Sequence, residues 1–367
     1  MAKKELYRRS TALVAHWQDD DLILENYVKG SRTPLPPQLA EIVMETSGPL
    51  TMSALMKALA PVGYARMLAK LFVDRGIFVK AGSRLDRMER AIEKHWAAWD
   101  TPARHFYYAT RNTGFHPWTR EIDAPDFTSR DDPPSPFHER KGEAVALPPF
   151  HFEATDRVLE VLRVRRTLRR TSGRPISLDD FSRVVGWTWG VTHVVDNAIM
   201  RRFLLKTSPS GGGRHPTEVY AAVLRVDDLE PGLYHYATAR DALTRIKSGF
   251  FEEELERICC QGDFLRGAAA VFFMTAIVAR SMWKYPISHA LRVLFLDAGH
   301  LGQTFHVVCT DLGLAPFSFA AFNAHDAETF LGIDGIREIP IYACVVGVPA
   351  ADDPARSDRL GPAEIRS

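Results

Sequence analysis

The 367-residue sequence is poor in cysteine, with four residues, Cys259, Cys260, Cys309 and Cys344, and no CxxC spacing. All four stand in apolar or helical surroundings, which predicts buried reduced thiols and neither a disulfide framework nor a zinc site. No apolar run is long enough to cross a bilayer, and no apolar segment follows the basic N-terminus as it would in a signal peptide. We therefore expect a soluble, cytoplasmic protein without a metal site.

The sequence also lacks an excess of charge of either sign. It has 46 Lys and Arg against 45 Asp and Glu, for a net charge of +1, which argues against bulk electrostatic binding of nucleic acid. No Gly-x-Gly-x-x-Gly follows a predicted strand, so nothing supports a Rossmann dinucleotide site. What is present is an ordinary globular composition, 46% hydrophobic and 25% charged, with room for two domains.

The first part of the chain, residues 1–115, predicts a small module with a winged-helix-like arrangement. The expected elements are a hairpin, three helices and a short strand, at residues 11–17, 22–28, 36–44, 51–59, 63–74 and 77–79. The third helix carries few side chains suited to reading bases, so we favour docking of a peptide or partner, or a structural role, over DNA binding. Residues 116–150 are rich in Pro, Asp and Ser and predict a linker or wrapping loop.

The remaining residues, 151–367, predict an α+β domain with a mixed sheet and helices on both faces. Two continuous apolar runs, 268–278 and 339–348, are typical of buried strands. Between them, residues 287–312 have the three- and four-residue apolar spacing of a long helix, either a core or a dimer-interface helix. Small residues on it, Ala298, Gly299 and Gly302, would let another helix approach closely. Further helices are expected at residues 156–166 and 177–189, and strands at 218–226 and 233–236.

Two clusters suggest one pocket for a phosphorylated planar cofactor. The first is Arg165-Arg166-Thr167-Leu168-Arg169-Arg170, whose guanidinium groups match the geometry of phosphate oxygens. The second is Pro209-Ser210-Gly211-Gly212-Gly213, whose bare backbone N–H groups can approach a flat ligand closely. A solvated basic helix end followed by a flexible glycine loop remains the alternative.

Six motifs in order resemble the nitroreductase superfamily, and specifically its SagB-type dehydrogenases, which oxidise azoline rings in ribosomally made peptides. They are Arg165 to Arg169, Pro209 to Gly212, Pro231-Gly-Leu-Tyr-His-Tyr236, Lys284-Tyr285, Asp297-Ala-Gly-His300-Leu-Gly-Gln303 with Leu312-Gly-Leu314, and a leading segment containing Leu13-Val-Ala-His-Trp17 and Trp99 to Phe106. The chain departs from the family at Thr167, where serine is usual. A second departure is Phe319-Ala320-Ala321, where relatives often carry Gly or Glu-Gly.

The resemblance implies FMN bound at a homodimer interface. Arg165, Arg166 and Arg169 would contact the phosphate and the ring carbonyl oxygens, with Thr167 adding a hydroxyl hydrogen bond. Pro209, Ser210, Gly211 and Gly212 would lie along the isoalloxazine, from the neighbouring subunit. The other expected cofactor contacts are Gln303, Gly313, Leu314, Phe319, Ala320, Ala321 and, as a weaker phosphate candidate, Arg356.

The resemblance also implies that a hydride passes to flavin N5 while Lys284 and Tyr285 assist removal of the adjacent proton. Tyr285 would accept or relay the proton, and Lys284 would ease its deprotonation or polarise the ring nitrogen; His289 and His300 are alternative carriers. The expected partners are a precursor peptide and a synthetase. Two other functions stay open, an NAD(P)H-dependent nitro or quinone reductase and a non-catalytic scaffold of a biosynthetic complex.

Overall fold

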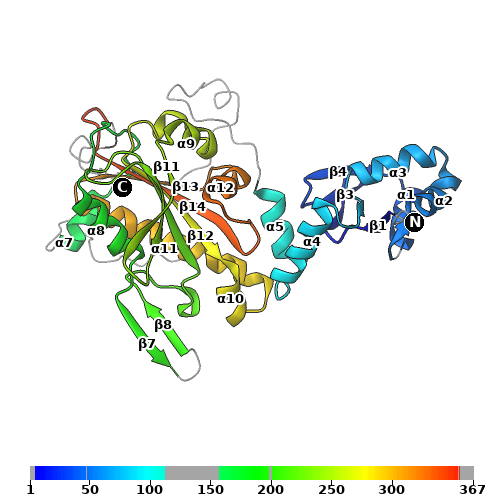
Figure 1. The fold of residues 1–367 in the computed structure, drawn as a ribbon, viewed down its shortest axis with the longest axis horizontal. Helices are drawn as coiled ribbons and strands as arrows, with labels where there is room; N and C mark the ends of the chain where they lie inside the picture. Colours follow the sequence, from blue (N-terminus) through cyan, green and yellow to red (C-terminus); the bar gives the residue numbers. More distant parts are fainter. Residues whose placement is uncertain (1–4, 47, 112–156, 198–200, 354, 356–367) are drawn as a thin grey trace, which may run out of the picture.

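The computed structural model describes residues 5–46, 48–111, 157–197, 201–353 and 355. Figure 1 shows an N-terminal module and a larger domain side by side along the long axis of the molecule. The predicted linker, residues 116–150, lies outside the described residues. Within them, no helix is long and apolar enough to cross a membrane.

A six-stranded sheet forms the centre of the larger domain, in the order β11-β10-β9-β12-β14-β13. Its strands are β9 (Thr217–Val223), β10 (Gly232–Ala237), β11 (Ala242–Ser248), β12 (Ala270–Ile277), β13 (Ala315–Phe319) and β14 (Glu338–Gly347). Every pairing between these strands is antiparallel. The prediction of a mixed sheet is therefore wrong for the named strands, and the parallel bridge between Ile176 and Val226 lies outside them.

Helices cover both faces of this sheet, which is why its central strands are apolar throughout. Along β12, Phe272 packs in the apolar cluster of α8 (Leu178–Trp189) and α11 (Leu291–Asp311). Its neighbour Phe273 packs on the opposite face with α9 (Glu252–Cys259) and α12 (Ala324–Leu331). Alternate residues of a strand point to opposite faces, so an antiparallel strand covered on both sides shows no polar alternation.

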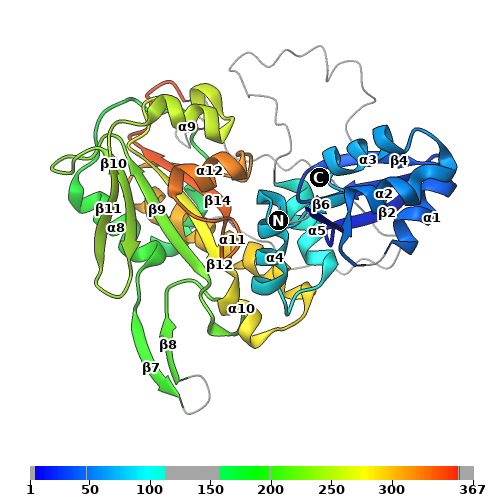
Figure 2. The ribbon, with the colours of Figure 1, turned by 45° about the vertical axis from the view of Figure 1, so that its right-hand side comes forward.

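Three shorter elements complete the larger domain. They are α7 (Arg157–Val164), α10 (Val278–Lys284) and a hairpin of β7 (His193–Asn197) and β8 (Arg201–Leu205). The hairpin extends away from the body in both views (Figures 1 and 2). This hairpin was not predicted from the sequence.

The N-terminal module has its own apolar core, in which Leu55, Phe72 and Phe78 are fully buried. Its elements are β1 (Leu6–Arg9), β2 (Leu13–Gln18), β3 (Asp21–Asn26), β4 (Ser31–Leu35), α1 (Pro37–Glu45), β5 (Leu50–Thr51), α2 (Met52–Leu59), α3 (Ala65–Asp74) and β6 (Phe78–Lys80). The hairpin, the three helices and the final strand match the predicted order. The small sheet has the order β5-β1-β6. The N-terminal strand β1 therefore pairs with β6, in the place that the second strand of the wing takes in a winged helix.

Helices α4 (Arg84–His95) and α5 (Thr101–Thr110) join the module to the larger domain. Buried Trp96 donates from its indole Nε1 to the carbonyl of Ile336 at 2.8 Å, and buried Trp99 donates to the carbonyl of Tyr285 at 3.1 Å. Figure 2 shows these helices lying against the larger domain next to α10. The module is therefore fixed directly to the segment that carries the Lys284-Tyr285 pair.

The four cysteines are free thiols, as expected. Cys259, Cys309 and Cys344 are buried, and burial raises the pKa of each well above its ordinary range. Cys260 is only half-buried, because it follows the last residue of α9 in a left-handed turn.

Small residues on α11 have two different environments, which yields a test of packing. A β-carbon at Gly302 would lie 2.8 Å from the Tyr342 ring of β14, so the close neighbour is a strand and not the helix we predicted. Gly299 faces open space. We expect Gly302→Ala to lower the free energy of unfolding by about 1–3 kcal/mol through overpacking. Gly299→Ala should raise it by about 0.5–1 kcal/mol. Chemical denaturation of both variants checks this, and equal effects would contradict it.

Candidate functional site

The glycine loop is held on α11 by one buried carboxylate. Asp297, 3% exposed, accepts hydrogen bonds from the Ser210 hydroxyl at 2.5 Å and from the Gly211 N–H at 2.9 Å. Burial raises the pKa of this carboxyl, and the two hydrogen bonds act in the opposite direction. A β-carbon at Gly211 would lie 2.2 Å from Cγ1 of Val293, so the loop reaches the helix only because that residue is glycine.

Lys284 and Tyr285 converge on the same loop. The Lys284 Nζ donates to the carbonyl of Gly212 at 3.1 Å. A β-carbon at Gly212 would lie 2.5 Å from the Tyr285 hydroxyl and 2.9 Å from the Lys284 Nζ. Gly212 also has a φ of +65°, a left-handed conformation that favours glycine. One chain therefore brings the predicted proton-transfer pair and the predicted flavin loop together.

Charged residues next to the glycine loop connect it to α10. Arg280 pairs with Glu218 at 2.6 Å and donates to the carbonyl of His215 at 3.1 Å. Burial opposes ionisation of Glu218, but hydrogen bonding by His235 and the charge of Arg280 hold its pKa below the ordinary value. Half-buried Lys206 donates to the carbonyl of Trp189, and desolvation lowers its pKa to about 8. The loop thus has a fixed position relative to the helix that ends in Lys284.

The arginine cluster follows α7 and lies at the other half of α11. Within the described residues, Arg165, Arg166 and Arg169 have no carboxylate partner, whereas Arg170 pairs with Asp352 at 3.0 Å. Arg166 donates to backbone carbonyls, and Arg169 lies over the ring of Phe317 at 5.0 Å from its centre. Arginines without acidic partners leave their guanidinium charge available to an anion.

His306 of α11 shares this environment. Its Nε2 lies 3.1 Å from the Ser318 hydroxyl, and its buried Nδ1 has no hydrogen-bond partner in the part of the chain that the structure describes. Burial, reinforced by the charges of Arg165 and Arg169, lowers the pKa of His306 to about 4. The imidazole is therefore neutral at physiological pH, and its titration reports on the two arginines.

A pH dependence of stability follows from His306. The folded chain keeps the imidazole neutral down to about pH 4, whereas an unfolded histidine takes up a proton near pH 6.5. The unfolded state binds more protons within this window, so the free energy of unfolding should fall as the pH falls from 6.5 to 4. In His306→Gln, the part of this decrease that comes from protonation of His306 should be absent. His215, whose pKa is also lowered to about 4, remains in both proteins.

The measurement is the midpoint of thermal unfolding against pH for the wild-type protein and His306→Gln. Because every other group is common to both, the difference between the two curves isolates His306. Parallel curves between pH 6.5 and 4 would contradict the assignment.

Two of the other predicted cofactor residues lie at the loop or near the arginine cluster. Pro209 lies at the loop, where its carbonyl is 3.3 Å from Nδ1 of His300. Phe319 is buried beside Phe317, near Arg169. Gln303, Gly313 and Ala320 are exposed, Thr167 and Ala321 are half-buried, Leu314 is buried, and Arg356 lies outside the described residues.

The loop and the arginine cluster are not in contact within one chain. The loop contacts α11 at Asp297, and the arginines act on His306, nine residues further along. At 1.5 Å per residue, that separation is about 13 Å of helix. A single chain therefore presents two half-sites.

Sequence reasoning assigned no role to Asp297, Arg280 or His306. Asp297 was visible as the first residue of the Asp-Ala-Gly-His motif, and that acidic residue on an apolar helix was a usable signal. Arg280 and His306 gave none, because their roles depend on contacts between distant segments.

Comparison with known proteins gives the relatives of this chain. A protein of the nitroreductase type from Methanocaldococcus jannaschii is 29% identical over 188 residues, which are 51% of this chain and 89% of that protein. The trifolitoxin-processing protein TfxB of Rhizobium leguminosarum bv. trifolii is 27% identical over 177 residues, 47% of each protein. The chain thus spans about half the length of TfxB.

A solved structure supports the fold over a larger part of the chain. A chain of the E. coli microcin synthetase McbBCD complex, with truncated pro-MccB17 bound, matches with a TM-score of 0.51 and 16% identity. The match covers 71% of this chain and 97% of that one. The model of the nitroreductase family matches residues 162–348, more than half of the sequence. The chain belongs to the nitroreductase family.

Proposed function

We propose that this protein is an FMN-dependent dehydrogenase that oxidises azoline rings in a ribosomally made peptide. The observation that carries the proposal is the convergence of Lys284 and Tyr285 on Gly212 of the glycine loop. The family consists of oxidoreductases, so a redox reaction is expected, and this pair adds groups that can handle a proton. The oxidation, the cofactor and the assigned residues are proposals for this chain.

The residues present fit FMN. Arg165, Arg166 and Arg169 offer guanidinium groups without a carboxylate partner in the described chain, which suits a phosphate dianion. At the other half-site, the backbone of Gly211 and Gly212 carries no side chain, and neither position has room for a β-carbon. Ser210 and Pro209 border that surface.

A second copy of the chain would bring the half-sites together. The exposed face of α11 carries Leu296, 62% exposed, with exposed Gln303 further along. Apolar side chains on an exposed helix face are typical of a subunit interface. We propose a homodimer in which the arginines of one subunit and the loop of the other hold the same cofactor.

The chemistry assigned to the chain is proton management. FMN, when bound, supplies the acceptor for the hydride that leaves the azoline carbon. Tyr285 accepts or relays the proton from the adjacent carbon, and Lys284 directs its positive charge to the ring nitrogen. The Lys284 Nζ lies 5.6 Å from the centre of the Tyr285 ring, so both groups act on one small region. The ring loses two hydrogens and becomes aromatic.

The peptide substrate is supported by the relatives and by the N-terminal module. TfxB is named as a trifolitoxin-processing protein, and the McbBCD structure contains truncated pro-MccB17. A reductase of small molecules has no need for a module fixed to the Lys-Tyr segment. We propose that this module contacts the precursor peptide or a partner synthetase, with an exposed strand edge available for an added strand.

The second candidate keeps the cofactor and changes the substrate to a nitroaromatic compound or quinone. The relative from M. jannaschii favours it, since that protein is of the nitroreductase type. Rapid reduction of the bound flavin by NADPH would support this alternative. A purified protein without flavin absorbance would support a non-catalytic scaffold.

The test is anaerobic incubation of the purified protein with thiazoline- and oxazoline-containing peptides. We expect the flavin absorbance to bleach and the peptide mass to fall by that of two hydrogens. Bleaching with NADPH but with no azoline peptide would overturn the proposal in favour of the small-molecule reductase.

A further inference from the structure

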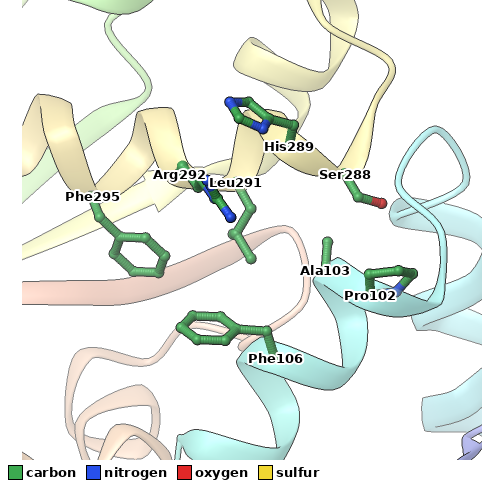
Figure 3. Close-up of a pocket in the computed structure, with 8 residues that line it drawn as sticks. All are labelled: Pro102, Ala103, Phe106, Ser288, His289, Leu291, Arg292 and Phe295. Atoms are coloured by element: carbon green, nitrogen blue, oxygen red, sulfur yellow. The ribbon is translucent and has the colours of Figure 1, made fainter.

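A pocket of about 410 Å³ lies between α5 of the N-terminal part and the beginning of α11. Figure 3 shows the rings of Phe106 on α5 and Phe295 on α11 next to one another, with Leu291 and Ala103 nearby. Ligand pockets in proteins have volumes of about 300–1,000 Å³. The space therefore suits one or two amino-acid side chains.

The pocket exposes aromatic surface. Phe106 is 54% exposed and Phe295 is 37% exposed, and their rings meet edge to face with centres 6.2 Å apart. Leu291 and Ala103 are buried beside them. An apolar side chain placed against these rings would remove water from surface that the chain itself leaves uncovered.

A cation accompanies this apolar surface. Arg292 lines the pocket, and Figure 3 shows it between Phe295 and Leu291. Among the described residues, Arg292 has neither an ion pair nor a hydrogen bond, while the nearby acidic residue Asp100 accepts from the hydroxyl of the wall residue Ser288. A guanidinium group without a partner is complementary to a carboxylate.

The pocket is rigidly connected to the candidate site. Its wall residue Ser288 is three positions after Tyr285, and both are tied to the same stretch of the N-terminal part. The Asp100 N–H donates to the Ser288 hydroxyl at 3.0 Å, and the Trp99 indole donates to the carbonyl of Tyr285 at 3.1 Å. A peptide whose ring lies at Lys284 and Tyr285 therefore has this pocket within reach of its neighbouring residues.

We propose that the pocket binds the peptide substrate beside the reacting ring. It takes up a large apolar side chain against Phe106 and Phe295, and Arg292 pairs with the carboxylate of a neighbouring Asp or Glu. The inference rests on the proposed function and adds the sequence class of the substrate. We commit to an acidic side chain over a free C-terminus, because an azoline within a peptide has residues on both sides.

The experiment measures binding of end-blocked, fluorescent thiazoline peptides to the FMN-loaded protein by anisotropy. The peptides carry Phe-Asp, Ala-Asp or Phe-Asn beside the ring, and a fourth ends in Phe with a free carboxylate. We expect the Phe-Asp peptide to bind about tenfold more tightly than the others. Phe106→Ala should erase the preference for Phe, and Arg292→Gln the preference for Asp; Phe295→Ala replaces Phe106→Ala if the latter does not fold.

Matched controls exist in the chain. Phe250 is 53% exposed, against 54% for Phe106, and Arg174 is an exposed arginine away from the pocket. Phe250→Ala and Arg174→Gln should keep both preferences. Equal binding of all peptides by the wild-type protein would overturn the proposal. So would Phe106→Ala and Arg292→Gln proteins that retain both preferences, or tightest binding of the peptide with a free C-terminus.

A minimal thiazoline without neighbouring residues separates this proposal from the proposed function. It should reduce the flavin equally in the wild-type protein and in Phe106→Ala, because it has no side chain for the pocket. Loss of that reduction in Phe106→Ala would overturn the pocket assignment. If no azoline reduces the wild-type flavin, the proposed function fails, and the binding series still decides on the pocket.

Discussion

Replacing Tyr285 with phenylalanine is expected to leave a yellow protein whose flavin is reduced by an azoline peptide about 100-fold more slowly, or worse. The physical reason is that a positioned proton-transfer group contributes about 10²–10⁴ in rate. The substitution removes only the hydroxyl that lies closest to Gly212 and leaves the ring, which packs against the core. Anaerobic stopped-flow absorbance of the bound flavin measures the rate, and the absorbance before mixing measures the cofactor content.

Two further variants interpret that result. Lys284→Met should also slow flavin reduction, and unlike Tyr285→Phe it should lose part of the cofactor, because the Lys284 Nζ also holds the carbonyl of Gly212. Tyr236→Phe removes a different tyrosine hydroxyl, one bonded to Asp241 on the sheet, and should react at the wild-type rate. Wild-type rates in both Tyr285→Phe and Lys284→Met would remove the pair from the mechanism.

Replacing Asp297 with alanine is expected to release the glycine loop and with it the cofactor. The carboxylate accepts from Ser210 and Gly211, and hydrogen bonds to a charged group contribute about 1.5–3 kcal/mol each. We expect the affinity for FMN to fall by about 100-fold, a loss of about 2.7 kcal/mol. Titration of flavin-free protein with FMN, followed by quenching of flavin fluorescence, measures this affinity.

The same helix provides the control. Asp311 is exposed and pairs with Arg157 at 2.7 Å, so Asp311→Ala should change stability by less than about 1 kcal/mol. Asp297→Asn keeps an oxygen for the Gly211 N–H and should lie between the wild-type protein and Asp297→Ala. Unchanged FMN affinity in Asp297→Ala would show that the loop holds its conformation without this carboxylate.

Elements with strong local signals were predictable from the sequence. The apolar spacing at 287–312 corresponds to α11, and the two continuous apolar runs correspond to β12 and β14. Ser177 and Thr51 cap their helices by accepting from the backbone N–H groups of Asp180 and Ala54, which is a common role of serine and threonine. These features depend on neighbours in sequence, so the pattern suffices.

Features that depend on distant segments were not predictable. The continuous apolar runs indicated buried strands but not their direction, because burial of both sheet faces by helices gives the same pattern in a parallel and an antiparallel sheet. The family resemblance pointed to Lys284, Tyr285 and the loop, and their proximity in the structure comes from α10 and Arg280. Arg165 and Arg169 are separated from that loop because the two clusters lie at different parts of α11, which local composition does not encode. The roles of these residues in binding and catalysis stay predictions.

The indole contacts of Trp96 and Trp99 have a consequence for engineering. A chimera that exchanged the N-terminal module together with α4 and α5 for those of a relative would replace an aromatic cluster which also contains Tyr107 and Tyr108. The segment taken from the relative would have to contain equivalent rings. Otherwise the carbonyl groups that Trp96 and Trp99 bind in the larger domain would lose their hydrogen-bond donors. An exchange of the N-terminal module therefore calls for a junction placed before α4, within the first 83 residues.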